Sequence, residues 1–126
     1  MKERGSEMTK LKWKNQIVKH CKAVGTYKDS FVPVIETLAE ILEQRDLIRE
    51  EFDKSGARPV VIHTNKVGAE NLSKNPLLIF WDEMNKSALA YWRDLGLTPA
   101  GLKRIDEQAV KVKKGNALAE ALKALG

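Results

Sequence analysis

Cysteine and histidine are the residues best able to act as nucleophiles or metal ligands, and both are scarce in this sequence. The 126 residues contain one cysteine, Cys21, and two histidines, His20 and His63. His20 and Cys21 are neighbours in a predicted helix, so their side chains diverge and do not form a nucleophile–base pair. His63 falls in a predicted strand, as a surface or packing residue. Three such side chains are too few for a structural zinc site, and we expect no metal ion.

Other catalytic signatures are also missing from the sequence. There is no glycine-rich phosphate loop and no GxSxG nucleophile motif. The adjacent carboxylates Asp82 and Glu83 lie near a predicted helix start, where the helix dipole favours negative charge. We therefore expect a protein that is not an enzyme and holds no cofactor. An enzyme whose site follows no known motif is kept as a third hypothesis.

Positive charge is concentrated at the two ends of the chain. Residues 1–28 carry eight basic and two acidic side chains, residues 29–58 carry four and eight, and residues 97–126 carry six and three. A basic segment can bind the phosphates of DNA, although the lysines of one isolated helix are about equally often a solvated face. The candidate contacts to double-stranded DNA are Lys10, Lys12, Lys14, Lys19, Lys22, Lys103, Arg104, Lys111, Lys113 and Lys114.

Helical periodicity predicts the elements that would position these side chains. Thr9 can cap a first, basic helix over residues 10–24, and Gly25 can end it in the left-handed conformation. A second helix, residues 29–54, has a heptad-like apolar seam that needs a partner helix from this chain or from another copy. The residues expected to pack in the core or between copies are Phe31, Leu38, Ile41, Leu42, Ile48, Phe52, Trp81, Tyr91 and Trp92.

The rest of the chain predicts a hairpin and two more helices. The β-branched residues 60–62 and the turn residues 64–68 favour strands over 60–64 and 68–72. Asn75-Pro76 and Thr98-Pro99 are both helix starts, and Gly96 between them is a helix end. Gly115-Asn116 is expected to break the last helix. One mainly helical domain, 1–126, follows, with a basic helix (1–28), a seam helix (29–56), a hairpin (59–73), a helix–corner–helix segment (75–114) and a tail (115–126).

Several aromatic residues and the helix corner leave alternatives open. Trp81, Tyr91 and Trp92 could stack on bases, but their places on or beside an apolar stripe favour packing. Trp13 lies among lysines, and burial against a helix and contact with DNA suit it equally. The corner also allows residues 97–114 to read DNA in a helix-turn-helix-like transcriptional regulator, although a long aromatic-rich helix precedes it.

The segments NKVG (65–68) and NPLLIFWDEMNKSALAYWRDLGLTPAGLKRI (75–105) occur in an order that resembles phage terminase small subunits. In that family a glycine-containing hairpin precedes an Asn-Pro helix start, a Leu-Gly-Leu-(Ser/Thr)-Pro joint and a basic helix. The matching residues here are Gly68, Asn75-Pro76, Leu95 to Pro99 and Lys103-Arg104. The resemblance covers about residues 27–112, and the ordered set is more specific than any one motif.

The resemblance implies a non-enzymatic DNA-packaging subunit in an infected bacterial host. Such proteins form homo-oligomeric rings, bind viral DNA and regulate the large terminase, the ATPase and nuclease of packaging. The hairpin could then complete a sheet with its neighbours. The choice of DNA-contacting lysines rests on charge alone. A cytoplasmic location agrees with the short apolar run at 76–81 and the charged N-terminus, which lacks a secretory signal.

Overall fold

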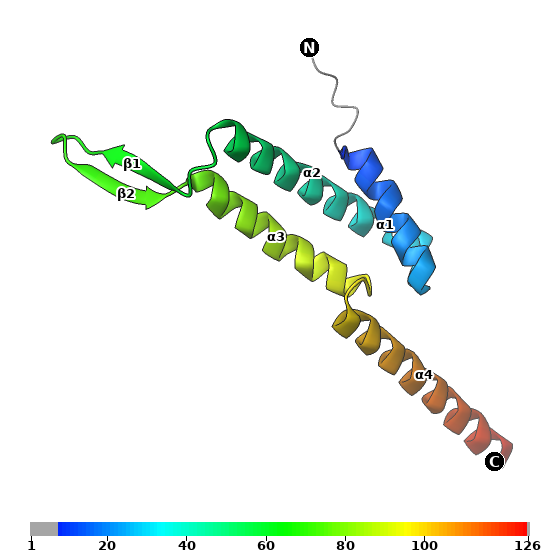
Figure 1. Ribbon diagram of the computed structural model, residues 1–126. Helices are drawn as coiled ribbons and strands as arrows, with labels where there is room; N and C mark the ends of the chain where they lie inside the picture. The colour runs from blue at the N-terminus through cyan, green and yellow to red at the C-terminus, as the bar shows by residue number, and fades with distance from the viewer. Residues whose placement is uncertain (1–7, 126) are drawn as a thin grey trace.

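The computed structural model describes residues 8–125, which form four α-helices, a short 3-10 helix and one β-hairpin (Figure 1). Residues 1–7 of the predicted basic segment and residue 126 of the predicted tail lie outside the described residues. Along the chain the elements are α1 (Lys10–Val24), η1 (Asp29–Phe31), α2 (Val32–Lys54), β1 (Val60–Thr64), β2 (Glu70–Lys74), α3 (Pro76–Asp94) and α4 (Pro99–Leu125).

The core lies where three helices meet. Helices α2 and α3 run antiparallel to each other, and α1 packs along α2 (Figure 1). The heptad-like seam of α2 thus finds its partner helix within the same chain, and the predicted mainly helical fold with a long helix pair is confirmed. The buried core consists of Ile17, Cys21, Ile35, Leu38, Ala39, Leu42, Ala88 and Leu95.

Side-chain caps fix the helix starts that the sequence predicts. The Thr9 hydroxyl accepts a hydrogen bond from the main-chain N–H of Lys12 at 3.3 Å. Asn75 accepts from the N–H of Leu77 at 3.0 Å and also donates to the carbonyl of Arg58 at 2.9 Å. The second bond joins the start of α3 to the residues before β1, so one asparagine anchors the base of the hairpin.

The hairpin projects from one end of the helix pair (Figure 1). Strands β1 and β2 are antiparallel, with Ile62 opposite Leu72, and both of these side chains are exposed. The predicted second strand, 68–72, is wrong by two residues. The Asn65 side chain accepts hydrogen bonds from the N–H groups of Val67 and Ala69, which extends the turn before β2 begins.

At the other end, α4 leads away from the bundle (Figure 1). Gly96 is in the left-handed conformation, with φ of 73°, which agrees with the predicted end of a helix at this residue. The Thr98 hydroxyl accepts a hydrogen bond from the N–H of Gly101 at 3.0 Å, which agrees with the predicted start of the next helix at Thr98-Pro99. The predicted break at Gly115-Asn116 is wrong, because α4 is continuous to Leu125. One internal glycine costs a helix only about 1 kcal/mol, and the flanking lysine, alanine and leucine residues are strong helix formers.

Candidate nucleic-acid and assembly surfaces

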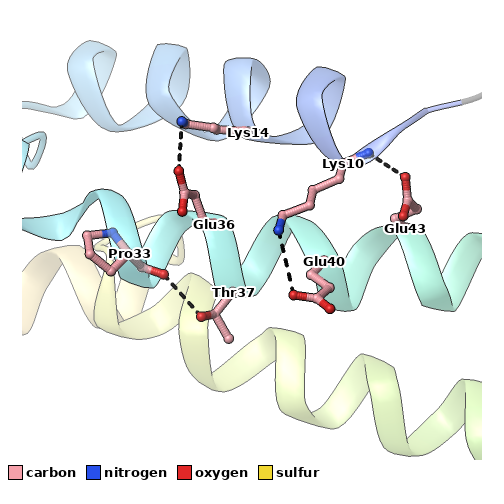
Figure 2. A network of polar contacts seen from close by, with 7 residues as sticks. All are labelled: Lys10, Lys14, Pro33, Glu36, Thr37, Glu40 and Glu43. Carbon is pink, nitrogen blue, oxygen red and sulfur yellow. Dashed lines mark hydrogen bonds and ion pairs between the residues drawn. The ribbon is translucent and has the colours of Figure 1, made fainter.

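Two of the five candidate lysines on α1 contact acidic side chains of α2 (Figure 2). The Nζ atom of Lys14 donates to Glu36 Oε1 at 2.9 Å, and the Nζ atom of Lys10 lies 3.7 Å from Glu40 Oε2. The main-chain N–H of Lys10 donates to Glu43 at 2.6 Å. These contacts dock α1 on α2 by charge complementarity between a basic helix and an acidic one.

The Lys14–Glu36 pair has an electrostatic signature. The hydrogen bond and charge of Lys14 lower the pKa of the Glu36 carboxyl below its usual value, and Lys10 adds a smaller effect in the same direction. Partial exposure screens the pair, so its contribution to stability is modest. Lys10 and Lys14 therefore have partners on α2 that compete with DNA for their charges.

The other three candidate lysines of α1, Lys12, Lys19 and Lys22, are exposed. Lys12 and Lys19 border a shallow hollow of about 300 Å³ whose remaining wall is Met8, Asn15 and Gln16. The ammonium of Lys22 lies 4.9 Å from the centre of the Tyr27 ring, a cation–π distance. A polar, cation-bordered surface of this kind suits a phosphate backbone, which binds by charge and without base contacts.

The second basic surface is on α4. Its five candidate residues are all exposed, and the guanidinium of Arg104 has a charged neighbour, Asp94, at 3.8 Å. Two acidic residues of the same helix, Asp106 and Glu107, lie among the lysines along a shallow groove. The structure therefore places the candidates on two separate helices, as an α1 group and an α4 group. The α4 group is Lys103, Arg104, Lys111, Lys113 and Lys114.

The aromatic residues pack instead of standing clear for base stacking. The indole N–H of Trp13 donates to Asp46 Oδ2 at 2.8 Å, so burial against α2, one of the two alternatives, is the one observed. Tyr91 and Trp92 pack against the core, and the Arg49 guanidinium lies 5.4 Å from the Trp81 ring. Of the residues predicted to pack, Leu38, Leu42 and Phe52 are buried, whereas Phe31, Ile41, Ile48, Trp81, Tyr91 and Trp92 are half-buried.

Arg45 has a structural role that the seam pattern could not reveal. Its guanidinium donates to Asp46 at 2.9 Å and to Asn85 of α3 at 3.4 Å, and it lies 5.5 Å from the Trp13 ring. The one polar member of the α2 seam therefore connects α1, α2 and α3. Only the three-dimensional contacts show why an arginine stands there.

The residues first considered for chemistry do not converge on a site. Cys21 is buried in the core, and burial raises the pKa of its thiol, which opposes nucleophilic reactivity. His20 and His63 are exposed on separate elements, and Asp82 pairs with Lys86 at 3.0 Å. Within residues 8–125 no cluster of three or more potential metal ligands occurs. Among these residues, too, no helix has the length and apolar character needed to cross a membrane.

The geometry thus defines a helical bundle with two basic surfaces and two projecting arms, the hairpin and α4. A family model described as "Phage terminase, small subunit" matches residues 10–111. The chain belongs to this family, and the resemblance seen in the sequence is confirmed. Membership supports a role in phage DNA packaging. Small subunits of this family are generally not enzymes themselves. Comparisons with curated proteins and with solved structures returned no match.

Proposed function

We propose that this protein is the ring-forming, DNA-binding small subunit that regulates the large terminase during genome packaging in the host cytoplasm. The family match over residues 10–111 carries the proposal. The non-catalytic character is proposed from the family, in which small subunits are generally non-catalytic. The partners are double-stranded viral DNA, the large terminase and further copies of this chain.

DNA binding is supported by the two basic surfaces. Lys12, Lys19 and Lys22 of α1 and the five basic residues of α4 place their charges on exposed faces. Phosphate neutralisation releases counterions, so binding by such surfaces falls steeply with salt. Lys10 and Lys14 contribute mainly by holding α1 in place.

Self-association is supported by the apolar side chains that the single chain leaves uncovered. The facing pair Ile62 and Leu72 is 63% and 75% exposed, on a two-stranded hairpin that is marginally stable alone. Burial of the hairpin against neighbouring copies would stabilise it. Contacts between different surfaces of identical subunits close into rings when the rotation permits.

The alternative, a transcriptional regulator that reads DNA with residues 97–114, has less support. In a helix-turn-helix reader the N-terminal residues of the recognition helix contact base edges. Here Gly101, in the first turn of α4, is buried against Arg93 of α3. The start of α4 therefore packs against the end of α3.

Salt-dependent DNA binding tests the proposal. We expect the triple variants K12A/K19A/K22A and K111A/K113A/K114A each to weaken binding and to reduce the slope of log K against log salt by about 0.9 for each phosphate that is no longer neutralised. The control K66A/K74A removes two lysines of the hairpin region and should leave the slope unchanged. Unchanged slopes in both triple variants would exclude these surfaces, and tight binding to one palindromic site would favour the regulator.

A further inference from the structure

The hairpin has two free strand edges, because the sheet of the described residues contains only β1 and β2. A free edge carries main-chain N–H and C=O groups that can pair with another strand. A two-stranded ribbon is also marginally stable alone. Strands from a second chain would therefore satisfy these groups and stabilise the ribbon.

The hydrogen bonds at the two ends of the hairpin show which main-chain groups point outward. The N–H of Asn65 donates to the carbonyl of Ala69 at 2.9 Å. At the base, the N–H of Asn75 donates to the carbonyl of Pro59, also at 2.9 Å. Hydrogen-bonded pairs alternate with non-bonded pairs along an antiparallel ladder, so the pairs at odd positions are the bonded ones. The even positions of each strand therefore direct their N–H and C=O groups away from the partner strand.

The even positions of β2 are Glu70, Leu72 and Lys74, which place opposite charges at the two ends of this edge. All three side chains are exposed and lie on one face of the sheet. Within residues 8–125 neither Glu70 nor Lys74 forms an ion pair. Two parallel β2 strands in register would bring like charges together. Two antiparallel β2 strands centred on Leu72 would instead bring each glutamate opposite a lysine.

We propose that β2 of one copy pairs antiparallel with β2 of a second copy, with the two Leu72 residues opposite each other at a twofold axis. Glu70 of each strand then lies opposite Lys74 of the other strand. Three hydrogen-bonded pairs supply about six main-chain hydrogen bonds. A shift of two residues in either direction loses both charge pairs, so the charges select this register.

The same register also covers apolar surface. The Leu72 side chain, 75% exposed in the single chain, then lies between Ile62 of its own chain and Leu72 of the second copy. The edge of β1 has no comparable signal, because its outward residues Val60, Ile62 and Thr64 are uncharged and favour no single register. The β2 edge is thus the one with charge complementarity to itself.

The placement of the hairpin is compatible with this contact. The hairpin projects from one end of the α2–α3 pair (Figure 1). Antiparallel pairing puts the bases of the two hairpins at opposite ends of the paired strands, so the two helical bundles lie apart.

The pairing rests on the self-association proposed above and adds a twofold contact to it. A contact that uses the same surface on both copies is complete with two chains. A ring therefore needs a further contact between different surfaces, and each contact can be tested separately.

Oxidative crosslinking of the full chain tests the register. The two Cα atoms of a hydrogen-bonded antiparallel pair are about 5.5 Å apart, within disulfide range, so we expect L72C to crosslink two chains. The matched control is I62C, because the two Ile62 residues would be three strand spacings, about 14 Å, apart. The wild type, whose single Cys21 is buried, should not crosslink. Crosslinking of I62C in place of L72C would assign the contact to β1 and overturn the proposal.

Charge reversal gives the sharper result. In E70K/L72C and in L72C/K74E both cross-strand pairs become like-charged, so we expect pairing to weaken roughly tenfold and the crosslink yield to fall. An equal mixture of these two variants should restore crosslinking between unlike chains. The variant E70K/L72C/K74E should crosslink as well as L72C does. A yield that does not respond to these charges would overturn the proposed register. Circular dichroism checks that the helical bundle is kept in each variant.

Native mass separates this inference from the ring-forming role. A wild-type ring whose L72C variant fails to crosslink would overturn the strand pairing and leave the ring intact. A wild-type mass of two chains, together with crosslinking of L72C, would contradict the ring and support the strand pairing.

Discussion

The hydroxyl of Thr26 donates a 2.7 Å hydrogen bond to the main-chain carbonyl of Leu95, and this buried bond joins the turn after α1 to the end of α3. The two residues are 69 positions apart in the chain. Gly96 follows directly, and a Cβ atom added there would come within 2.9 Å of both Thr26 and Ile105. The turn after α1 therefore sets the position from which α4 departs.

Removing this bond should destabilise the protein. We expect T26V to lower the free energy of unfolding by about 1–3 kcal/mol, because the buried carbonyl of Leu95 loses its hydroxyl donor. Urea denaturation measures the change. The matched control is T37V, since the exposed Thr37 hydroxyl donates only to the Pro33 carbonyl of its own helix. Equal losses of unfolding free energy in the two variants would show that the buried Thr26 bond stabilises the fold no more than the exposed Thr37 bond does.

Two glycines of α4 should respond oppositely to alanine. Gly101 is packed so closely on the carbonyl of Arg93 that an added Cβ would overlap it, and G101A should shift the junction and destabilise the protein by about 1–3 kcal/mol. Gly115 has open space around it, so G115A should stabilise α4 by about 0.5–1 kcal/mol. Thermal unfolding followed by circular dichroism tests both. A stabilised G101A would contradict the close helix contact.

The ion pair between Lys14 of α1 and Glu36 of α2 predicts a pH dependence of known sign. The pKa of Glu36 is lowered in the folded chain, so the pair stabilises the fold above the ordinary carboxyl pKa and loses its effect as pH falls through the lowered value. We expect K14M to raise the pKa of Glu36 toward its usual range, measured by NMR titration of its side chain. K19M, on the exposed side of α1, is the control. A titration of Glu36 that is unmoved by K14M would refute the pairing.

Cys21 should be protected from thiol reagents. The side chain is fully buried, and burial raises the pKa of the thiol, so both access and thiolate formation are limited. We expect alkylation by iodoacetamide at pH 8 to be much slower in the native protein than in urea, because burial limits the access of the reagent and also the formation of the thiolate. Similar rates in both conditions would place Cys21 at the surface.

Much of the fold can be predicted from local signals. Thr9, Gly25, Asn75-Pro76 and Thr98-Pro99 determine helix ends through caps and backbone preferences that act within a few residues. The turn residues predict the hairpin but not its register, because the Asn65 side chain lengthens the turn. Gly115 does not break α4, because the helix propensity of the flanking residues outweighs one glycine.

The candidate surfaces are harder to predict because charge patterns do not show partners. All five lysines of α1 look alike in the sequence, yet Lys10 and Lys14 face Glu40 and Glu36 on a helix more than 20 residues away. The Thr26–Leu95 bond, and the hollow between the end of α1 and the α3–α4 junction, depend on elements that only the fold brings together. The packaging role follows from membership of the family, and no group of side chains in the sequence indicates it.

Native mass spectrometry of the full chain at micromolar concentration tests the ring-forming role most directly. We expect a single closed assembly with more than two copies of the 14.2 kDa chain, whose mass stays constant on further concentration. A dimer would favour the regulator alternative. A monomer that persists at high concentration would contradict the proposed ring.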